Sequence, residues 1–386
     1  MPATAPARGT LVILGGAVKD GHDALWQSVV QAAGGAGALV LVLPAASADP
    51  ERAARVTAMQ LERRGARVEV LPIAPAWPGS TAADARARAH EPAWVARVQQ
   101  AGGIFMTGGD QNQLMDVLRQ EGRDTALLAA IRALHARGGV VAGTSAGAAV
   151  MSLSAILSVD DPFDALRRPL RPDELGRGLG LAPEHVVTDQ HFLRRGRVPR
   201  LVRALLQDGR LLGLGVEEDS AAIVRGGVAE AAGARGLLIV DASQAIVEAG
   251  APLRVRELRL SYVDRGDRFD LQTRRVLPPA TRQPLQQGAA QGRPGFFGDI
   301  LGDNVVVGAM ARAAEGPGRQ SVGLAWRPEQ ALAFEWRLSA DARTRAWGGP
   351  TRDDHTIEAL RLDIEPVRLA QPVYQPLPAQ GSDPPR

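Results

Sequence analysis

The chain has 386 residues, 45% hydrophobic and 23% charged, and so is long enough for one large globular core with an extension, or for two domains. Its formal net charge of +3 and its 4% of aromatic residues, with no basic stripe of interleaved aromatics, disfavour nucleic-acid binding. The sequence has no cysteine, which excludes disulfides and a cysteine nucleophile, and no apolar run long enough to span a bilayer, so no membrane partner is expected.

Short apolar runs alternate with amphipathic segments over the first part of the chain. The predicted strands cover residues 10–14, 38–43, 68–72, 103–107 and 140–142. The predicted helices between them cover residues 26–33, 50–64, 82–100, 113–120 and 125–137. This alternation indicates an α/β fold with a mostly parallel sheet and helices on both faces. In such sheets functional residues collect beyond the carboxyl ends of the strands.

The second half of the sequence predicts more strands, and its composition changes along the chain. A polar, arginine-rich stretch at 154–181 reads as a long loop over the site. Strands are expected at 186–188, 212–216, 222–224, 237–240 and 255–260, and a helix at 198–206. Residues 283–295 have a linker-like composition and are followed by further apolar runs. We therefore expect an N-terminal tail at 1–9, a catalytic domain at 10–276, a mixed or β-rich extension at 277–371 and a disordered tail at 372–386.

The segment Gly143-Thr144-Ser145-Ala146-Gly147 carries the first candidate for chemistry. It follows a short apolar strand and precedes small, helix-compatible residues. Glycines on both sides of a serine allow a sharp strand–turn–helix that presents the hydroxyl above the sheet edge. Ser145 is therefore a candidate nucleophile.

A serine nucleophile needs a base that takes its proton and an acid that orients the base. His191 follows the strand at 186–188, on the same rim as Ser145 if that strand is parallel. Glu217 and Glu218 follow the strand at 212–216, and only one of them is expected to reach the histidine because adjacent residues point to opposite faces. Asp160 and Asp161, which follow the nucleophile helix, are alternative acids.

An oxyanion hole would complete such a site. The amide of Ala146 is a natural donor because the residue after the nucleophile opens the helix. The amide of Gly109 or Asp110, on the glycine-rich turn after the strand at 103–107, is a second candidate.

The motifs, in their order, resemble those of the cyanophycinases. They are Thr107-Gly108-Gly109-Asp110-Gln111, Gly143-Thr144-Ser145-Ala146-Gly147-Ala148, Asp189-Gln190-His191-Phe192 and Gly215-Val216-Glu217-Glu218-Asp219-Ser220, with Gly15-Gly16 and the run 263–270 also similar. The likeness covers about residues 8–275 and implies a class I glutamine amidotransferase-like (flavodoxin-like) fold, in a serine peptidase family that includes aspartyl dipeptidase.

The resemblance implies that Ser145 is the nucleophile, His191 the general base and Glu218 the orienting acid. It also suggests that a set of polar residues lines the substrate cleft: Asp110, Gln111, Asp189, Gln190, Arg195, Arg197 and Arg200. Cyanophycin is a poly-aspartate backbone with arginine joined to each side-chain carboxyl, and family members release β-aspartyl-arginine dipeptides from it. The arginines can receive its carboxylates, and Asp160, Asp161, Asp164 or Asp189 its guanidinium groups.

Alternatives stay open at this point. Where cyanophycinases often carry a basic residue after the Gly-Gly-Asp-Gln motif, this chain has Asn112, Gln113, Leu114 and Met115, which leaves room for another specificity. A dipeptidase for N-terminal aspartyl or isoaspartyl peptides and a non-catalytic binding protein are the alternatives. The resemblance implies no metal or cofactor and suggests a homodimer. The extension resembles that of secreted members, so the compartment is either exported, with a signal removed, or cytoplasmic.

Overall fold

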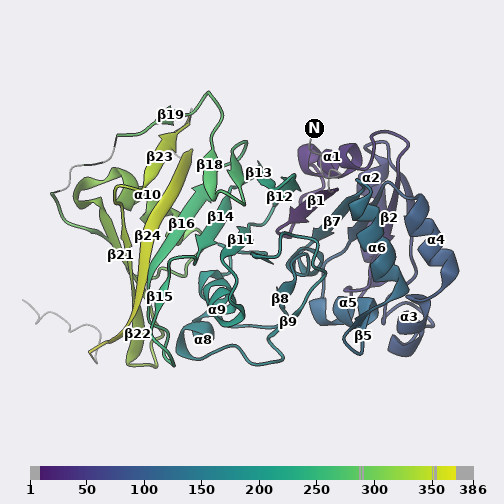
Figure 1. Cartoon of the computed structure of the whole chain (residues 1–386), viewed down its shortest axis with the longest axis horizontal. Coiled ribbons are helices and arrows are strands. Elements are labelled where there is room, and N and C mark those ends of the chain that lie inside the picture. The colour runs from purple at the N-terminus through teal and green to yellow at the C-terminus, as the bar shows by residue number, and fades with distance from the viewer. Residues whose placement is uncertain (1–8, 287, 289–290, 350, 352–353, 371–386) are drawn as a thin grey trace, which may run out of the picture.

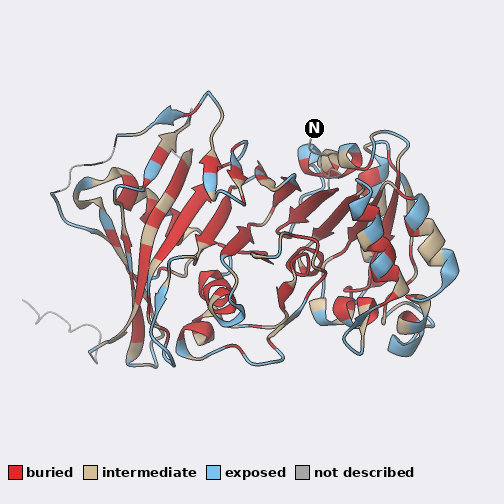
Figure 2. Cartoon of the chain, in the orientation of Figure 1, coloured by how far each residue is buried: buried red, intermediate tan, exposed pale blue. Residues whose placement is uncertain are grey.

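A computed structural model describes residues 9–286, 288, 291–349, 351 and 354–370. The described residues form an elongated molecule with a nine-stranded and an eleven-stranded sheet (Figure 1). Figure 2 shows that buried residues concentrate on the strands of both sheets. The tail predicted at 372–386 lies outside the described residues, as do residues 1–8. Within the described ranges, no helix has both the length and the hydropathy that a membrane crossing requires.

The first sheet has a parallel part that matches the predicted strands. Its strands, in spatial order, are β1 (Thr10–Leu14), β7 (Val140–Thr144), β4 (Gly103–Met106), β2 (Leu39–Leu43) and β3 (Arg67–Val70). Antiparallel strands extend it beyond β1: β12 (Ser220–Arg225), β13 (Val228–Gly233), β17 (Arg268–Asp270) and β18 (Arg275–Leu277).

Helices cover both faces of this sheet, because alternate side chains of each buried strand point to opposite sides. Val12 and Leu14 of β1 join the apolar core beneath α1 (Asp23–Ala32) and α2 (Pro50–Glu62). Leu11 and Ile13 join the core on the other face. The elements there are α3 (Ala82–Arg88), α4 (Pro92–Gln100), α5 (Gln111–Leu118), the hairpin β5 (Arg119–Gln120) and β6 (Arg123–Asp124), and α6 (Ala126–Ala136). The predicted α/β architecture is confirmed.

The prediction of a single helix at 82–100 is wrong. The chain forms two helices there, because Pro92 begins α4 and the residue before a proline is pushed out of the helical region. Glu91 accordingly has extended dihedrals (φ −63°, ψ 123°). The polar stretch at 154–181 is likewise more structured than a plain loop, since it holds β8 (Ser154–Ile156), α8 (Pro162–Arg167) and β9 (Leu175–Arg177).

The second sheet joins the middle of the chain to its C-terminal part. Its strands, in order, are β10 (Val186–Asp189), β11 (Leu212–Val216), β14 (Leu237–Asp241), β16 (Val255–Val263), β24 (His355–Arg368), β22 (Leu332–Ser339), β21 (Gln320–Ala325) and β20 (Gly295–Phe297). Shorter strands flank them: β15 (Ile246–Val247), β19 (Gln283–Pro284) and β23 (Arg345–Gly348). One apolar core joins this sheet to α8, α9 (Val198–Asp208) and α10 (Val305–Glu315), after which comes the short helix η1 (Pro317–Arg319).

A seam separates the two sheets, and the chain crosses it repeatedly: between β7 and β10, β11 and β12, β13 and β14, β16 and β17, and β18 and β19. Residues 217–219 are one such crossing. The long strand β24 of the extension pairs with β16, so the extension continues the sheet that begins at β10. The boundary predicted at residue 276 falls within β18 and stays a prediction about folding units.

A buried polar cluster fastens the extension to the first sheet's antiparallel edge. The Arg282 Nη2 atom lies 2.8 Å from Asp264 Oδ2, and its Nε atom lies 3.1 Å from Asp267 Oδ2. Thr356 of β24 donates its hydroxyl to the same Asp267 carboxylate. The motif at 263–270 therefore has a structural use, because its acids compensate a buried guanidinium.

Replacing Arg282 with alanine should destabilise the protein by about 3–5 kcal/mol, because it leaves two buried carboxylates without their cation. Chemical denaturation of the whole chain measures the free energy of unfolding. Arg86→Ala is the matched control, since the Arg86–Asp116 pair is exposed and should contribute no more than about 1 kcal/mol. Equal losses in the two variants would contradict the structural role of the cluster.

Candidate active site

Ser145 stands at a strained turn at the carboxyl end of β7. Its dihedrals are φ 52° and ψ −114°, a region that non-glycine residues rarely adopt and that costs about 1–3 kcal/mol. The turn can be this tight because of its glycines. A Cβ atom on Gly143 would lie 2.5 Å from the carbonyl carbon of Gly147, and one on Gly147 would lie 2.5 Å from the carbonyl oxygen of Met106. The predicted helix after the serine is one short turn, α7 (Ala146–Ala149).

The structure brings the three residues of the predicted nucleophile–base–acid set into one hydrogen-bonded row. The Ser145 Oγ atom lies 3.0 Å from His191 Nε2. The His191 Nδ1 atom lies 2.6 Å from Glu218 Oε1. His191 is 7% exposed and Ser145 is half-buried, so the row is shielded but open at the hydroxyl. In this arrangement the carboxylate fixes the tautomer of the ring and leaves Nε2 to accept the serine proton.

This row spans the seam between the sheets. Ser145 follows β7 of the first sheet, whereas His191 and Glu218 follow β10 and β11, which pair in parallel in the second. The turn after β1 bridges the gap: the His191 amide donates to the Gly15 carbonyl at 2.8 Å. Gly16 has φ 105°, and a Cβ atom there would lie 2.4 Å from His191 Nε2. Only glycine fits beneath the ring.

Glu217 supports the site from behind and was expected only as a rival to Glu218. It is 2% exposed, and its carboxylate turns away from the histidine. One oxygen, Oε2, accepts the amides of Leu193 at 2.5 Å and Arg194 at 2.8 Å, and the other accepts the amide of Glu218 at 2.6 Å. The side chain thus ties the loop after His191 to the residue that orients His191. The alternation of side chains at a strand end predicted that only one glutamate reaches the histidine, and the family resemblance pointed to Glu218. The backbone contacts of Glu217 were not predicted.

Burial and neighbouring charges shift the protonation of His191, the predicted base. Burial lowers the pKa of His191, the hydrogen bond that the ring donates to Glu218 opposes that shift, and the Arg195 and Arg197 guanidinium groups reinforce it. The neutral imidazole that a general base requires is therefore favoured down to a lower pH than in a free histidine. Burial also lowers the pKa of Arg197 to about 10, partly offset by Asp189.

Two of the predicted cleft residues are committed to each other. Asp189 is fully buried and Arg200 is 2% exposed. The guanidinium binds the carboxylate through Nε at 2.8 Å and Nη2 at 2.5 Å, and its Nη1 atom donates to the Val159 carbonyl at 3.2 Å. This bidentate pair lies under the loop that carries His191. Its polar atoms face protein groups, so a direct substrate contact by either side chain stays a prediction that these bonds do not favour.

The other predicted cleft residues keep free or partly free groups. Gln190 is buried, and its Oε1 atom has no hydrogen-bond partner among the described residues. The Arg197 Nη1 atom donates to the Gln190 carbonyl at 2.7 Å, whereas Arg195 is exposed. The Gln111 amide donates to the Leu157 carbonyl, and Asp110 caps α5.

The two predicted oxyanion donors, Gly109 and Ala146, belong to segments beside Ser145. A Cβ atom on Gly108 would lie 3.0 Å from Ser145 Cβ, so the Gly108–Gly109 turn lies against the serine. Ala146 is the first residue of α7, where an amide has no intrahelical acceptor. The alternative acid Asp160 is exposed, and in the described part of the chain His191 Nδ1 bonds to Glu218 instead.

The extension also contacts the histidine loop, a feature that carries no local sequence signal. Asp303 accepts from Arg194 Nη1 at 2.7 Å and from Arg235 Nη1 at 3.0 Å. A Cβ atom on Gly196 would lie 2.4 Å from the Leu301 carbonyl oxygen, so the two segments pack closely. In the residues with described positions, no group of His, Asp or Glu side chains is arranged to hold a metal ion.

Comparison with known proteins identifies the family of the chain. The family described as Peptidase family S51 matches residues 11–232. The cyanophycinase of Nostoc sp. is 34% identical over 286 residues, which cover 70% of this chain and 89% of that protein. The cyanophycinase of Synechococcus elongatus is 33% identical over 288 residues, covering 72% of this chain and 84% of that protein.

The crystal structure of a peptidase from an acI-B1 Actinobacterium aligns with a TM-score of 0.48 at 21% identity, covering 62% of this chain and 93% of that one. The family match and the relatives place the chain in a definite class. This chain belongs to peptidase family S51 and is a serine-type peptidase.

Replacing Glu217 with glutamine should lower both stability and reactivity, because a side-chain amide cannot accept all three backbone amides. The free energy of unfolding should fall by about 1–3 kcal/mol. In a plot against pH, the plateau rate at which a serine-directed reagent acylates Ser145 should be lower. The pH at which this rate begins to decline should not change. Glu184→Gln, at an exposed carboxylate, is the control. A wild-type acylation rate in Glu217→Gln would rule out the positioning role.

Replacing Arg195 with alanine should move the acid limb of the acylation rate to higher pH. The Arg195 charge disfavours the imidazolium and so lowers the pKa of His191. Its removal raises that pKa, and the neutral base is then lost earlier as the pH falls. The measurement is acylation rate against pH in the two proteins. Arg52→Ala, an exposed arginine on α2, should leave the limb in place, and an unmoved limb in Arg195→Ala would refute this assignment.

Proposed function

We propose that this peptidase degrades cyanophycin, multi-L-arginyl-poly-L-aspartate, to β-Asp-Arg dipeptides, with Ser145 as nucleophile. The observation that carries the proposal is the row Ser145–His191–Glu218 at 3.0 and 2.6 Å. It occurs in a chain whose relatives at 32–34% identity are cyanophycinases. The geometry of the row thus supports the proposed chemistry, and the similarity to cyanophycinases separately supports the proposed substrate.

The geometry supports a two-step acyl transfer. The Ser145 oxygen attacks a backbone carbonyl of the polymer while His191 Nε2 takes the hydroxyl proton. The imidazolium, stabilised by Glu218, then protonates the leaving amine as the peptide bond breaks. Water attacks the acyl-enzyme, His191 takes a proton from that water and returns it to Ser145, and the dipeptide leaves as a carboxylate.

The backbone next to the serine offers the donors for the developing oxyanion. The Ala146 amide and the amide of Gly109 are the candidates, since both lie on turns that contact the nucleophile. Gly109 has φ 142°, and a Cβ atom there would lie 1.9 Å from the Ala46 carbonyl oxygen. The turn is therefore packed rigidly on its outer side, which suits preorganised donors.

Substrate recognition in this proposal uses the groups that the fold leaves unpaired. Arg195 is exposed beside the histidine and can receive an arginyl carboxylate of the polymer. The Gln190 Oε1 atom has no bonding partner in the described ranges and can accept from a substrate N–H or guanidinium group. Arg200 and Asp189 would act indirectly, by holding the loop beneath these contacts.

The decisive test is incubation of the protein with insoluble cyanophycin, with soluble products identified by mass. Wild-type protein should release β-Asp-Arg dipeptide, and Ser145→Ala should release none. The free energy of unfolding of Ser145→Ala should stay within about 1 kcal/mol of the wild-type value, because the change removes only one hydroxyl group. Ser28→Ala on α1 is the matched control. Turnover of N-terminal aspartyl dipeptides, with no product from the polymer, would instead favour a dipeptidase and sink the substrate assignment.

A further inference from the structure

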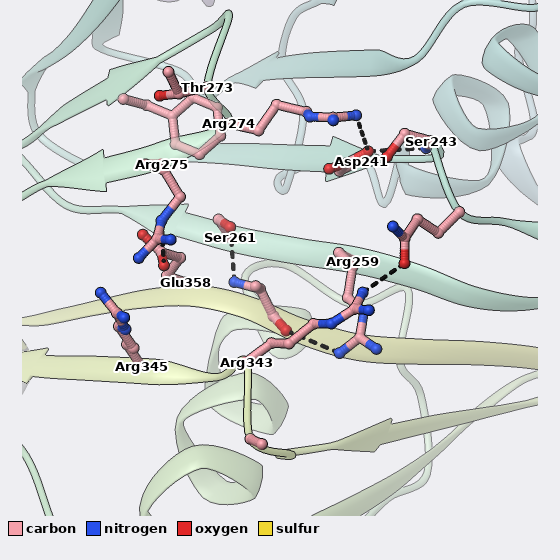
Figure 3. Close-up of a pocket in the computed structure, with 14 residues that line it drawn as sticks. Asp241, Ser243, Arg259, Ser261, Thr273, Arg274, Arg275, Arg343, Arg345 and Glu358 are labelled. Atoms are coloured by element: carbon pink, nitrogen blue, oxygen red, sulfur yellow. Dashed lines mark hydrogen bonds and ion pairs between the residues drawn. The ribbon is translucent and has the colours of Figure 1, made fainter.

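A second polar pocket lies on the face of the second sheet that points away from α10. Its volume is about 510 Å³. Leu258 and Leu260 of β16 join the core with α10, so Arg259 and Ser261, which alternate with them, face the other side. The turn between β17 and β18 and the strands β23 and β24 close the pocket (Figure 3). The extension thus supplies part of its wall.

The pocket is separate from the serine. Leu237, at one end of β14, pairs with Val216 at the seam, whereas Asp241, at the other end, lines the pocket. Four residues of strand correspond to about 13 Å. A single dipeptide unit bound at Ser145 would not fill both places.

Arginines dominate the described lining of this pocket. They are Arg259, Arg274, Arg275, Arg343 and Arg345, and the acidic residues among them are Asp241 and Glu358. Arg274 extends toward Asp241 at 3.6 Å, and Arg275 toward Glu358 at 3.0 Å (Figure 3). Each carboxylate also accepts a backbone amide, from Ser243 at 2.8 Å and from Val276 at 2.7 Å. Both acids are therefore already bonded.

The remaining guanidinium groups leave positive charge and donors unused. Arg343 donates to the neutral Gln244 side chain at 2.5 Å, and the nearby Asp341 accepts only its backbone amide, at 2.9 Å. Within the described residues neither the Arg343 nor the Arg345 guanidinium forms an ion pair. The Arg259 side chain is only 9% exposed, and its ends bind Glu257 and Asp341. Its buried Nε atom nevertheless has no partner in the described part of the chain. A buried donor without an acceptor is costly unless a ligand supplies one.

The strand pairing beneath the pocket is irregular, and this irregularity places Ser261 and Arg259 in contact with the backbone of Ala359. The pairing of β16 with β24 shifts register between Leu260 and Tyr262, and Ala359 has φ 58°. The Ala359 amide donates to the Ser261 hydroxyl at 3.0 Å, and the Ala359 carbonyl accepts from Arg259 Nη1 at 3.3 Å. Strained bulges of this kind recur beside functional sites, where they re-aim side chains.

We propose that this pocket is an exosite that binds arginyl carboxylates of the polymer at units distant from the one being cleaved; the inference rests on the proposed function. Guanidinium groups recognise carboxylates through paired hydrogen bonds. Each polymer unit carries one such carboxylate and one guanidinium group. The exposed Arg343 and Arg345 guanidinium groups on the wall of the pocket suit these carboxylates. A second hold on the same chain raises the effective concentration of polymer ends at Ser145.

The test uses the whole chain with Arg343 and Arg345 both replaced by alanine. In the Ser145→Ala background, sedimentation with insoluble cyanophycin should show at least a tenfold weaker binding constant than Ser145→Ala alone. In the active background, dipeptide release from polymer should show a raised KM with kcat retained, and a soluble dimer of the β-Asp-Arg unit should be cleaved at the wild-type rate. Arg52→Ala/Arg55→Ala, with the same loss of charge from the exposed face of α2, is the control.

Each outcome decides the proposal. Unchanged binding in the arginine variant, or an equal loss in the α2 control, overturns the exosite. The exosite is also overturned if inorganic phosphate stabilises the wild-type protein but not the arginine variant, while the two bind the polymer equally. The pocket would then be a phosphate site. Should wild-type protein bind cyanophycin through these arginines yet release no dipeptide, the exosite stands and the proposed function fails.

Discussion

The hydrogen bond between Ser145 and His191 is the constraint around which this structure is arranged, because its two ends belong to different sheets. The serine is held by a strained turn on a buried parallel strand, and the histidine by a loop of the second sheet. A misplacement of about 1 Å can cost a factor of a hundred in rate. The seam therefore needs rigid connections, and it has them in the Gly15 carbonyl, the close approach of Gly16 and the Glu217 carboxylate.

The C-terminal extension also helps to hold these connections in place. Asp303 and Leu301 contact the loop after His191, and Arg282 neutralises two buried acids at the crossing after β16. Because β24 pairs with β16, these contacts are fixed by the same sheet that carries β10 and β11. The C-terminal strands thus do part of the work of holding the histidine loop.

Sequence patterns predicted what is local and missed what depends on pairing between distant segments. The strand ends carrying Ser145, His191 and Glu218 were predictable, since short apolar runs followed by glycine or polar residues mark them. The split into two sheets was not, because β10 pairs with β11 rather than with β7, and such pairings leave no period in the sequence. The bond between Asp189 and Arg200 is invisible for the same reason: eleven residues separate two charges that only the fold brings together. A proline at position 92 could have divided the helix predicted at 82–100.

Charge pairing separates the arginines that build this protein from those that can bind a ligand. A buried guanidinium is tolerable only when carboxylates or carbonyl oxygens surround it, as for Arg200 and Arg282. Such residues cannot serve a substrate without first losing a partner. Arg195, Arg343 and Arg345 are exposed, and none of them forms an ion pair among the described residues, so a carboxylate can reach them without displacing a buried acid. In both proposals, the carboxylates of the polymer are therefore assigned to these exposed arginines and not to the buried ones.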